Sequence, residues 1–453
     1  MNRQELESLD KPALIDLLVS LLARIEALEA ENAQLKERLA KLEEPPKTPD
    51  NSSVPPSKGQ KANRPEPGGK KRRKGRKGVT RRLAENPDEE VDCKAEACPH
   101  CAHALEPDGQ KLAHEYDHVD IPPVTARTTR VRIFACRCPG CGRKARGTPP
   151  EGMEPGTPFG PRLHAFAAYL HHHHAIAYGR LSRLFKEIWN LSISEGAIAN
   201  ALKRTGTAMA GSREDILRLL RRARVMCSDE TGARVEGRTA WEWVFVSSHG
   251  VLHEMADTRG AVVARDILDG HEPEVWVSDR YTAQAGHGRD AQVCLAHVLR
   301  DVQYAIDEGD GVFAPGVRKL LRWVVAKHRR WGEVKSTTMA AHRRKADERL
   351  DALLALPVTT RAHEKLRKQV LGWRAWYFTC LERPDVPPTN NISERALRPS
   401  VIMRKVTNGF RSWHGAHGHA TIRSVIGTGA LNGLSPLQAI ERAIAGKPVC
   451  VAA

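Results

Sequence analysis

The chain has 453 residues, a length that exceeds one ordinary domain and predicts about two to four. Its formal net charge of +17 is typical of a protein that binds a polyanion or carries a basic tail. No apolar run approaches the roughly eighteen residues that cross a bilayer, and residues 1–10 lack the apolar core of a secretory signal. These features argue against membrane and secreted classes. They predict a cytoplasmic protein whose ten cysteines stay reduced.

The N-terminal segment, residues 1–46, has the leucine spacing of a coiled coil. Its heptad d positions are Leu14, Leu21, Leu28, Leu35 and Leu42, and its a positions are Leu18, Ile25, Asn32 and Leu39. Leucine at d with one asparagine at a favours a parallel two-stranded coil, so we expect a homodimer or a larger assembly. The alternative is an amphipathic helix packed against its own chain. The prolines at positions 45 and 46 end the helix in either case.

Residues 47–90 are expected to form a basic, disordered linker. The segment is rich in proline, glycine and cations and has too few apolar residues to build a core. Its densest positive cluster consists of Lys70, Lys71, Arg72, Arg73 and Lys74. Because these charges have one sign, we predict that the cluster clamps DNA phosphates without sequence preference. The alternative is a linker that only solubilises the chain.

Residues 91–150 are expected to form a zinc-binding module. Its two CxxC turns supply thiolates from Cys98, Cys101, Cys138 and Cys141. Four thiolates in two such turns make a closed tetrahedral site, which indicates structural rather than catalytic Zn²⁺. Cys136 is an alternative ligand in the second pair, Cys93 and His100 are weaker ones, and unmetallated buried cysteines are the other interpretation. Alternating residues over 129–133 predict strands between the turns.

The segment 155–222 has the residue pattern of helices and resembles a helix-turn-helix DNA-binding region. A turn is expected near Asn190, with Ser192 or Ser194 capping the second helix. A plain helical-bundle connector is the alternative. The four histidines of 171–174 point in four directions on a helix, so we expect a partly solvated face there rather than a metal site.

The hydrophobic period changes from helical to strand-like at the start of the segment 223–430. Strands are expected at 225–228, 239–248, 251–256 and 274–278, with a helix at 261–268. Three meandering strands, a helix and a further strand are the ribonuclease H-like arrangement. A Lys/Arg-rich helical insertion is expected over about 311–383, and residues 431–453 form a helical tail. The predicted fold class is therefore α+β and multidomain.

Two aspartates follow strands that are neighbours in this arrangement, Asp229 after the first strand and Asp279 after the fourth. Transfer at a phosphodiester needs two Mg²⁺ or Mn²⁺ ions about 4 Å apart. Such ions prefer carboxylate oxygens. A third carboxylate is expected from a late helix, where Glu394 shares one face with amide and guanidinium groups. Glu230 should face the opposite way from Asp229, because successive residues of a strand alternate.

Short motifs along almost the whole chain match one known family. They are Asp50-Asn-Ser-Ser with Pro55-Pro-Ser, the CPHC turn, Asp229-Glu-Thr, Ser278-Asp-Arg-Tyr, Cys294-x-x-His297, Asn390-Asn-x-x-Glu394-Arg and Arg404-Lys405. With these motifs the chain resembles transposases of the insertion-sequence-sixty-six family. It departs from that family at the additional Cys136 and in the region 171–177.

The resemblance implies a bacterial, nucleoid-associated DNA transposase with a DDE triad of Asp229, Asp279 and Glu394. It also implies binding to terminal inverted repeats, strand cleavage and strand transfer into target DNA, helped by small accessory proteins. Residues expected to contact DNA are Arg395, Arg398, Arg404, Lys405, Arg300 and His297. For His297 there are two alternatives. It could contact a side chain that binds the metal, or it could simply pack within its helix.

Other functions fit parts of the same pattern. A degenerate transposase kept as a non-catalytic DNA-binding regulator would lack one of the acids, and none is missing here. A ribonuclease H-like nuclease or resolvase would cut DNA without joining it. A zinc-and-zipper transcription factor would not need the long mixed α/β segment.

Overall fold

The computed structural model describes residues 10–43, 45, 47–52 and 81–450. The chain divides into two compact units. The smaller unit consists of Lys61–Arg130 together with Leu184–Ser192, and the larger unit contains the remaining segments. Within the described ranges, no helix combines the length and the apolar character that crossing a lipid bilayer requires.

The smaller unit has little regular structure over residues 81–130. Its short 3₁₀ helix is η1 (Pro107–Gly109). The Gln110 side chain holds the segment across a loop, because Oε1 accepts a hydrogen bond from the Ala95 N–H at 2.9 Å and Nε2 donates to the Ala95 carbonyl at 2.8 Å. Local hydrogen bonds of this kind, rather than a core, give the segment its shape.

Helix α2 (Lys11–Glu43) covers the predicted coiled-coil segment. Asp10 begins it, since its carboxylate accepts a hydrogen bond from the Ala13 N–H at 3.0 Å. The exposed fractions of Leu18, Leu21 and Ile25 are 57%, 48% and 52%. Within one chain this apolar stripe is therefore not covered, and helices gain most of their stability from packing such a stripe.

The first residues after α2 form a turn, so the expected disordered linker does not begin at residue 47. Asn51 is 4% exposed, and its Oδ1 accepts a hydrogen bond from the Thr48 N–H at 2.7 Å. Its Nδ2 donates to Asp307 at 3.0 Å. The amide side chain, which bonds both its own turn and a distant helix, explains why this short stretch is ordered.

The strands predicted at 129–133 do not form. Two short strands flank the second CxxC turn instead, and they pair antiparallel: β1 (Ala135–Arg137) and β2 (Lys144–Arg146). Cys136 lies in β1 opposite Ala145. The tight CxxC turn brings two strands together at once, whereas residues 129–133 have no partner strand.

The segment 155–222 is helical, as predicted. Its elements are α3 (Pro161–Ala168), the π-helix η2 (Tyr169–His173), α4 (Tyr178–Trp189), α5 (Glu195–Ala208) and α6 (Ala210–Leu220). Asn190 has a left-handed φ of 50° between α4 and α5. The Ser194 side chain accepts a hydrogen bond from the Ala197 N–H at 3.2 Å and so caps α5. The predicted order of helix, turn and capped helix is therefore present.

The prediction of a partly solvated histidine face is wrong for His171 and His172. These side chains are 4% and 5% exposed. They lie in η2, whose wider π turn bonds each residue to one five positions away and shifts the side chains relative to an α-helix. His171 Nδ1 lies 2.8 Å from the Ile176 carbonyl oxygen, and His172 Nδ1 lies 2.9 Å from His419 Nδ1.

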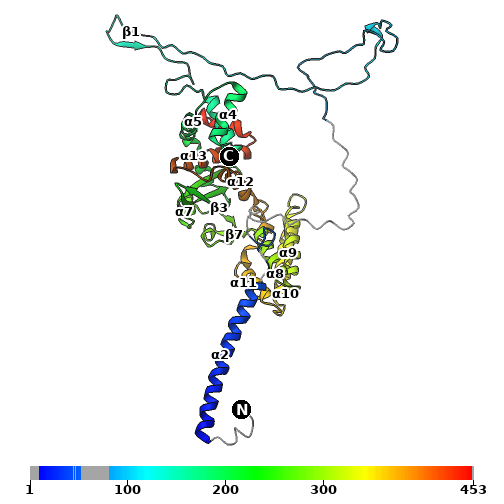
Figure 1. Cartoon of the computed structure of the whole chain (residues 1–453), viewed down its shortest axis with the longest axis vertical. Coiled ribbons are helices and arrows are strands. Elements are labelled where there is room, and N and C mark those ends of the chain that lie inside the picture. Colours follow the sequence, from blue (N-terminus) through cyan, green and yellow to red (C-terminus); the bar gives the residue numbers. More distant parts are fainter. Residues whose placement is uncertain (1–9, 44, 46, 53–80, 451–453) are drawn as a thin grey trace. The chain divides into compact units, whose positions relative to one another are not determined.

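The larger unit contains a five-stranded sheet with the strand order β5-β4-β3-β6-β7. Figure 1 labels β3 and β7 of this sheet. Its strands are β3 (Val225–Val235), β4 (Arg238–Val246), β5 (Val251–Ala256), β6 (Val275–Ser278) and β7 (Asp290–Val293). The β3–β4 and β4–β5 pairs are antiparallel, whereas β3–β6 and β6–β7 are parallel. Glu236 and Gly237 join β3 to β4 with φ values of 52° and 76°, as a two-residue hairpin requires.

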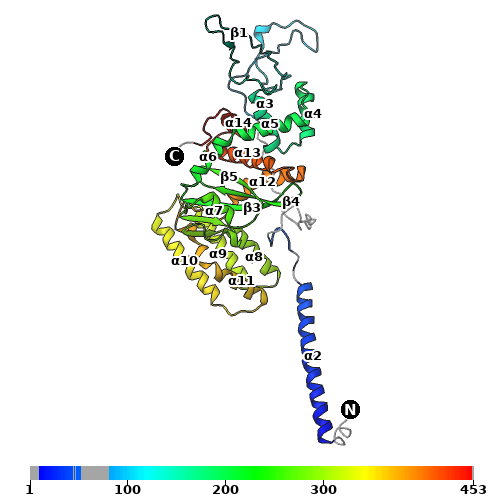
Figure 2. The same cartoon turned by 90° about the vertical axis from the view of Figure 1, so that its left-hand side faces the viewer.

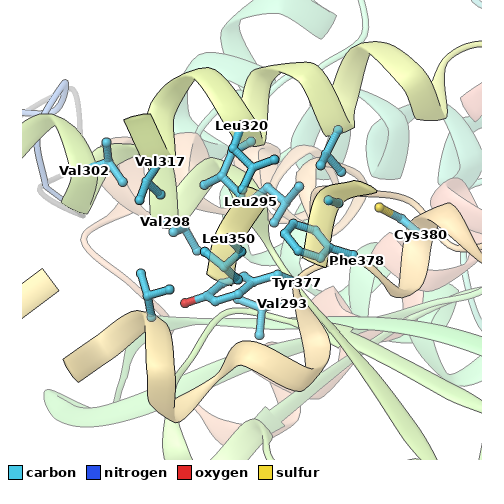
Figure 3. Packing of buried hydrophobic residues seen from close by; sticks show 14 of the residues in the cluster. Val293, Leu295, Val298, Val302, Val317, Leu320, Leu350, Tyr377, Phe378 and Cys380 are labelled. Atoms are coloured by element: carbon cyan, nitrogen blue, oxygen red, sulfur yellow. The ribbon is translucent and has the colours of Figure 1, made fainter. Parts of the chain in front are cut away.

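One helix follows β5, a short 3₁₀ helix follows β6, and the remaining helices of this region follow β7. They are α7 (Val262–Leu268), η3 (Thr282–Gln284), α8 (Leu295–Asp307), α9 (Phe313–His328), α10 (Ser336–Leu354), α11 (Arg361–Gly372), η4 (Arg374–Trp376) and η5 (Thr379–Leu381). One hydrophobic core joins the sheet to α8–α11, and Figure 3 shows Val293 and Leu295 in it beside Leu320, Leu350 and Phe378. This core places α8 against the parallel side of the sheet.

The last helices are α12 (Asn391–Thr407), α13 (Trp413–Leu431) and α14 (Pro436–Ile444). Helix α12 packs on β3 and β4, and α13 packs on β5. In Figure 2, α13 lies near β5, and α8–α11 gather toward the other side of the sheet. The Ser435 side chain and Gln438 form a capping box that begins α14.

Side chains cover both edges of the sheet. At the β5 edge, the His253 N–H donates to Ser424 at 2.8 Å, and the Val251 N–H donates to Thr428 at 3.0 Å. On β7, the Thr379 hydroxyl donates to the Ala291 carbonyl at 2.7 Å. Backbone groups that an edge strand would leave unpaired are thereby satisfied.

Candidate active site

Asp229 lies inside β3, opposite Val244 of β4, and Asp279 directly follows β6. The prediction that Asp229 follows the first strand is therefore wrong, because β3 continues to Val235 in its hairpin with β4. In the parallel register, Cys227 is opposite Val277. Each aspartate comes two residues after one of these partners, so the two carboxylates leave neighbouring strands on the same face of the sheet. Asp229 accepts a hydrogen bond from the Glu230 N–H at 2.9 Å, and Asp279 accepts one from the Tyr281 N–H at 2.8 Å.

Glu394, in the first turn of α12, adds a third carboxylate to this region. Burial raises the pKa of Asp229 well above its usual range, and the charges of Glu230, Asp279 and Glu394 raise it further. Like charges that meet in a buried place disfavour ionisation unless a cation shares them. An all-oxygen donor set of this kind suits Mg²⁺ or Mn²⁺. The donor chemistry of these residues therefore fits the divalent ions expected from the sequence.

Glu394 faces two basic side chains of α8. Its Oε1 lies 3.7 Å from His297 Nε2 and 3.9 Å from Arg300 Nη2. Burial lowers the pKa of His297, and Arg300 lowers it further. Across the part of the chain that the structure describes, no three His, Cys, Asp or Glu side chains are grouped closely enough to hold one ion.

Glu230 points away from the other acids, as the strand alternation predicts. Its side chain is 1% exposed, and Oε1 accepts hydrogen bonds from Arg259 at 2.8 Å and 2.6 Å. Gln284 Nε2 donates to Oε2 at 2.6 Å. The Arg259 guanidinium also lies 3.8 Å from the centre of the Tyr281 ring. Because Tyr281 follows Asp279 by two residues, this network ties the Asp279 loop to β3.

Hydrogen bonds at both ends of α12 attach it to β3. At the start of the helix, Asn390 Nδ2 donates to the Ser228 carbonyl at 2.6 Å. Near its end, Arg404 Nη2 donates to Thr231 Oγ1 at 2.9 Å. Since both acceptors flank Asp229 on β3, these bonds set the position of α12 along the strand that carries the first aspartate.

The middle of α12 is attached through a buried polar chain. Ser400 Oγ donates to Glu242 Oε1 at 2.7 Å and lies 3.0 Å from His419 Nε2. Because the hydroxyl hydrogen goes to Glu242, the His419 Nε2–H donates to Ser400, and the bare Nδ1 of His419 accepts from His172. Burial lowers the pKa of His419 to about 3, so this imidazole is neutral. Burial would raise the pKa of Glu242, but the bond and charge of His253 lower it to about 2.

Three of the basic residues expected to contact DNA, namely Arg395, Arg398 and Lys405, are exposed on α12. None of them forms an ion pair with a residue in the described ranges. Arg404 differs, because it is half-buried and bonded to Thr231, and burial lowers its pKa. The cluster of the basic linker lies outside the described residues: Lys70, Lys71, Arg72, Arg73 and Lys74.

The first CxxC turn has the hydrogen bonds of a metal-binding knuckle. The Cys98 N–H donates to the His103 carbonyl at 2.8 Å, and the Ala102 N–H donates to the Cys98 carbonyl at 2.9 Å. The backbone N–H groups of His100 and Cys101 donate to the Cys98 thiol and lower its pKa. A lowered pKa favours the thiolate, which is the form that binds a metal.

The second CxxC turn repeats this pattern. The Cys138 N–H donates to the Arg143 carbonyl at 2.8 Å, and the Gly142 N–H donates to the Cys138 carbonyl at 2.8 Å. The backbone N–H of Cys141 lowers the pKa of the Cys138 thiol. Cys136 stands before this turn, in β1, opposite Ala145 of β2. The geometry of each turn therefore favours Cys138 over Cys136.

Several residues around the acids escape reasoning from the sequence. Arg259 and Gln284 hold Glu230, yet they stand in segments without a motif. Arg280 pairs with Asp301. Its position directly after Asp279 in a shared motif is the signal that would have found it. Asn390, which anchors α12, likewise begins the Asn-Asn-x-x-Glu-Arg motif.

Comparison with known proteins places these residues within one family model. The model described as Transposase IS66 family matches residues 156–418. Among solved structures, the chain is similar to the Mos1 transposase paired-end complex with left transposon end, at 12% sequence identity and a TM-score of 0.12, over 59% of this chain and 83% of that chain. No curated protein matches the chain. The range of the family match includes Asp229, Asp279 and Glu394.

Proposed function

Because the chain belongs to the IS66 transposase family, we propose that it cleaves DNA at the terminal inverted repeats of its element and joins the freed 3′-OH to target DNA. One observation carries this proposal: Asp229 lies on β3 and Asp279 directly follows its parallel neighbour β6, and the charges of Glu230, Asp279 and Glu394 all act on the buried Asp229. A convergence of acids is what a two-metal phosphoryl-transfer site requires. The reaction comprises one hydrolysis and one transesterification at phosphodiesters.

The strand order supports a ribonuclease H-like catalytic core. The antiparallel strands β5-β4-β3 are followed by α7, and β6 then joins β3 in parallel. Helices α9–α11, between α8 and α12, agree with a helical insertion at about 311–383. In such a core the first aspartate, the second aspartate and the late glutamate come from β3, β6 and α12.

Asp229, Asp279 and Glu394 would hold two Mg²⁺ or Mn²⁺ ions, which when bound activate the attacking oxygen and neutralise the leaving oxygen. His297 and Arg300 would orient Glu394, since their nitrogens lie 3.7 Å and 3.9 Å from its Oε1. Arg259 pairs with Glu230, and Gln284 donates to its other oxygen, so the side chain of this fourth carboxylate already has protein partners.

Arg395 and Arg398 would hold phosphates beside the scissile bond, with Lys405 farther along the same helix. Their exposure on α12, close in sequence to Glu394, supports this role. Arg404 would serve mainly to anchor α12, because one of its nitrogens is bonded to Thr231. Arg398→Ala should weaken both DNA-end binding and cleavage. Unchanged binding and cleavage in that variant would remove Arg398 from the proposal.

Structural Zn²⁺ would bind Cys98, Cys101, Cys138 and Cys141. The support is the knuckle geometry of each turn, considered separately, and the lowered pKa of the leading thiol in each. A second copy of the chain would cover the apolar stripe of α2 in a parallel coiled coil, with Asn32 setting the register.

The proposal is tested by a strand-cleavage and joining assay with purified full-length protein and Mg²⁺. The substrate is DNA carrying the ends that flank the gene, the accessory proteins of the element are supplied, and wild type is compared with Asp279→Asn. Nicking and joining by wild type that vanish in the variant would support a transposase with this site. Binding without cleavage by either protein would favour a DNA-binding regulator. Cleavage without joining would favour a nuclease, and cleavage that survives Asp279→Asn would move the active site elsewhere.

A further inference from the structure

Helices α9 and α10 form an antiparallel pair that gathers cations around one tryptophan. Their axes approach closely where Gly316 faces Leu353, since a Cβ at Gly316 would lie 2.4 Å from Leu353 Cδ2. Farther along the pair, the Trp323 ring centre lies 4.6 Å from the Arg349 guanidinium carbon and 5.8 Å from Lys327 Nζ. The surface around this ring is called the α9/α10 basic face and consists of Trp323, Lys327, Arg330, His342, Lys345 and Arg349.

The spacing of these residues places them on one side of each helix. On α9, Lys327 follows Trp323 by four residues, and Arg330 lies in the turn just after the helix ends at His328. On α10, Lys345 and Arg349 follow His342 by three and seven residues. Residues at such intervals project from the same face of an α-helix. The His342 ring packs edge-on against Trp323 at 5.4 Å between ring centres, which joins the two rows into one surface.

The positive charge of this face is largely uncompensated. Among the described residues, Arg330 is the member of the face that has an acidic partner, Glu333 at 2.8 Å, and the two side chains are 52% and 64% exposed. An exposed pair of this kind contributes little and exchanges readily for another anion. Burial lowers the pKa of His342, and the charges of Lys327, Arg330 and Lys345 lower it further. The cations therefore act together on one point of the surface.

The chemistry of the face selects phosphate rather than a nucleobase. Trp323 lies beneath Arg349 and Lys327, so its ring holds cations in place instead of offering itself for base stacking. Two neighbouring rows of cations match the regularly spaced charges of a nucleic-acid backbone. We propose that the α9/α10 basic face binds the phosphate backbone of duplex DNA, apart from the Asp229–Asp279–Glu394 site. This rests on the proposed function, which supplies DNA as the substrate, and gives the helical insertion a role in holding it.

The test measures how DNA affinity depends on salt. Full-length wild type is compared with Lys327→Ala/Lys345→Ala/Arg349→Ala by fluorescence anisotropy, using a labelled duplex of arbitrary sequence over a series of KCl concentrations. Each phosphate contact that is lost should reduce the slope of log K against log [KCl] by about one. The triple variant should therefore show a slope smaller by about three. A wild-type slope in the triple variant would overturn the proposal.

A matched control removes the same charge from another helix of the insertion. Arg361→Ala/Lys365→Ala/Lys368→Ala changes three exposed cations of α11 and should keep the wild-type slope. An equal loss in both triple variants would mean that net charge alone matters and would also overturn the proposal. Lys327→Arg/Lys345→Arg/Arg349→Lys retains the charges and should keep the slope, which separates loss of cations from altered folding.

Failure here is distinguishable from failure of the proposed function. At low salt and saturating DNA, the α9/α10 triple variant should still cleave its DNA ends, because its carboxylates are intact. Asp279→Asn should bind DNA with the wild-type salt slope and not cleave. If wild type does not cleave but the triple variant still loses slope, the catalytic proposal fails and the α9/α10 basic face remains a DNA-binding surface.

Discussion

Ser400 of α12 donates a hydrogen bond to Oε1 of Glu242 on β4 at 2.7 Å, and both side chains are buried. The bond joins the helix that carries Glu394 to the strand next to the one that carries Asp229. It directly follows Pro399, whose missing N–H removes one bond of the helix itself. The attachment of α12 to the sheet therefore matters most where the helix is least self-supporting.

Ser400→Ala should impair metal use more than folding. Loss of this buried hydroxyl should lower the free energy of unfolding by about 1–3 kcal/mol, because Glu242 loses a donor. It should also raise the Mg²⁺ concentration for half-maximal cleavage by about tenfold, because Ser400 fixes the helix that carries Glu394. Loss of a residue that positions a metal ligand typically has an effect of this size. Chemical denaturation and a Mg²⁺ titration of cleavage measure the two effects.

Ser424→Ala is the matched control for Ser400→Ala. It also removes a buried serine hydroxyl, one that accepts from the His253 N–H at 2.8 Å on the β5 edge of the same sheet. We expect a similar loss of stability with a wild-type Mg²⁺ dependence. If both variants shift the Mg²⁺ dependence equally, Ser400 acts through general stability and does not position Glu394.

Asp229 should make the metal-free protein less stable as pH rises. Its pKa is higher in the folded state than in the unfolded chain, because burial and the charges of neighbouring acids disfavour its ionisation. Its contribution to stability is therefore present below the usual aspartate pKa of about 4 and is lost as pH rises through the raised pKa. In EDTA, Asp229→Asn should melt at a higher temperature than wild type at neutral pH, and the difference should shrink toward acid pH.

Mg²⁺ and a second variant complete this test. Added Mg²⁺ should raise the melting temperature of wild type more than that of Asp229→Asn, since the ion offsets the buried charge. Glu348→Gln, which changes an exposed carboxylate of α10, should follow wild type at every pH. A metal-free Asp229→Asn that melts below wild type throughout the range would contradict the raised pKa as a source of instability.

Zinc content should depend on the cysteines of the two CxxC turns. Cys101→Ser and Cys141→Ser should each reduce the zinc bound per chain, because a tetrahedral site that loses one thiolate holds the ion weakly. Elemental analysis of the purified full-length protein gives the ratio. Cys136→Ser is the control and should keep its zinc. If Cys136→Ser loses zinc and Cys138→Ser retains it, Cys136 rather than Cys138 is the zinc ligand.

The assembly state should depend on the d positions of α2. Leu21→Lys/Leu28→Lys replaces two leucines that are 48% and 51% exposed in the single chain and should yield monomers in sedimentation experiments. Asp16→Lys/Ala30→Lys adds lysines on the outer side of the same helix and should leave the assembly intact. A dimer that survives the leucine changes would place the main interface outside α2.

The central sheet could be predicted because its signals are local. Arg238–Val246 and Val251–Ala256 form strands close to the expected positions, since alternation of apolar residues reports the side of a strand directly. Val225–Val235 begins where expected but is seven residues longer than the predicted 225–228. The adjacency of the strands before Asp229 and Asp279 followed from that order. The end of the first strand was placed too early, since β3 continues past Asp229 to Val235, whereas Asp279 does follow β6 directly.

Contacts between distant segments could not be predicted. Glu242, Ser400, His419 and His172 belong to four different elements, and no residue of this chain of hydrogen bonds signals its partner locally. The π turn at Tyr169–His173 was missed for a related reason, because a helical pattern does not reveal where one additional residue is inserted. Arg259 was missed because arginine on a loop usually indicates only solvent exposure.

The covered edges of the sheet limit how molecules of this protein can associate. An open edge strand is a template onto which a strand of another molecule adds, which leads to domain swapping or fibrils. Here the hydroxyls of Ser424 and Thr428 on β5, and of Thr379 on β7, already occupy the edge groups. Copies of the chain are thus less able to add strand to strand, and contacts between them are left to helices and charged surfaces that can separate again.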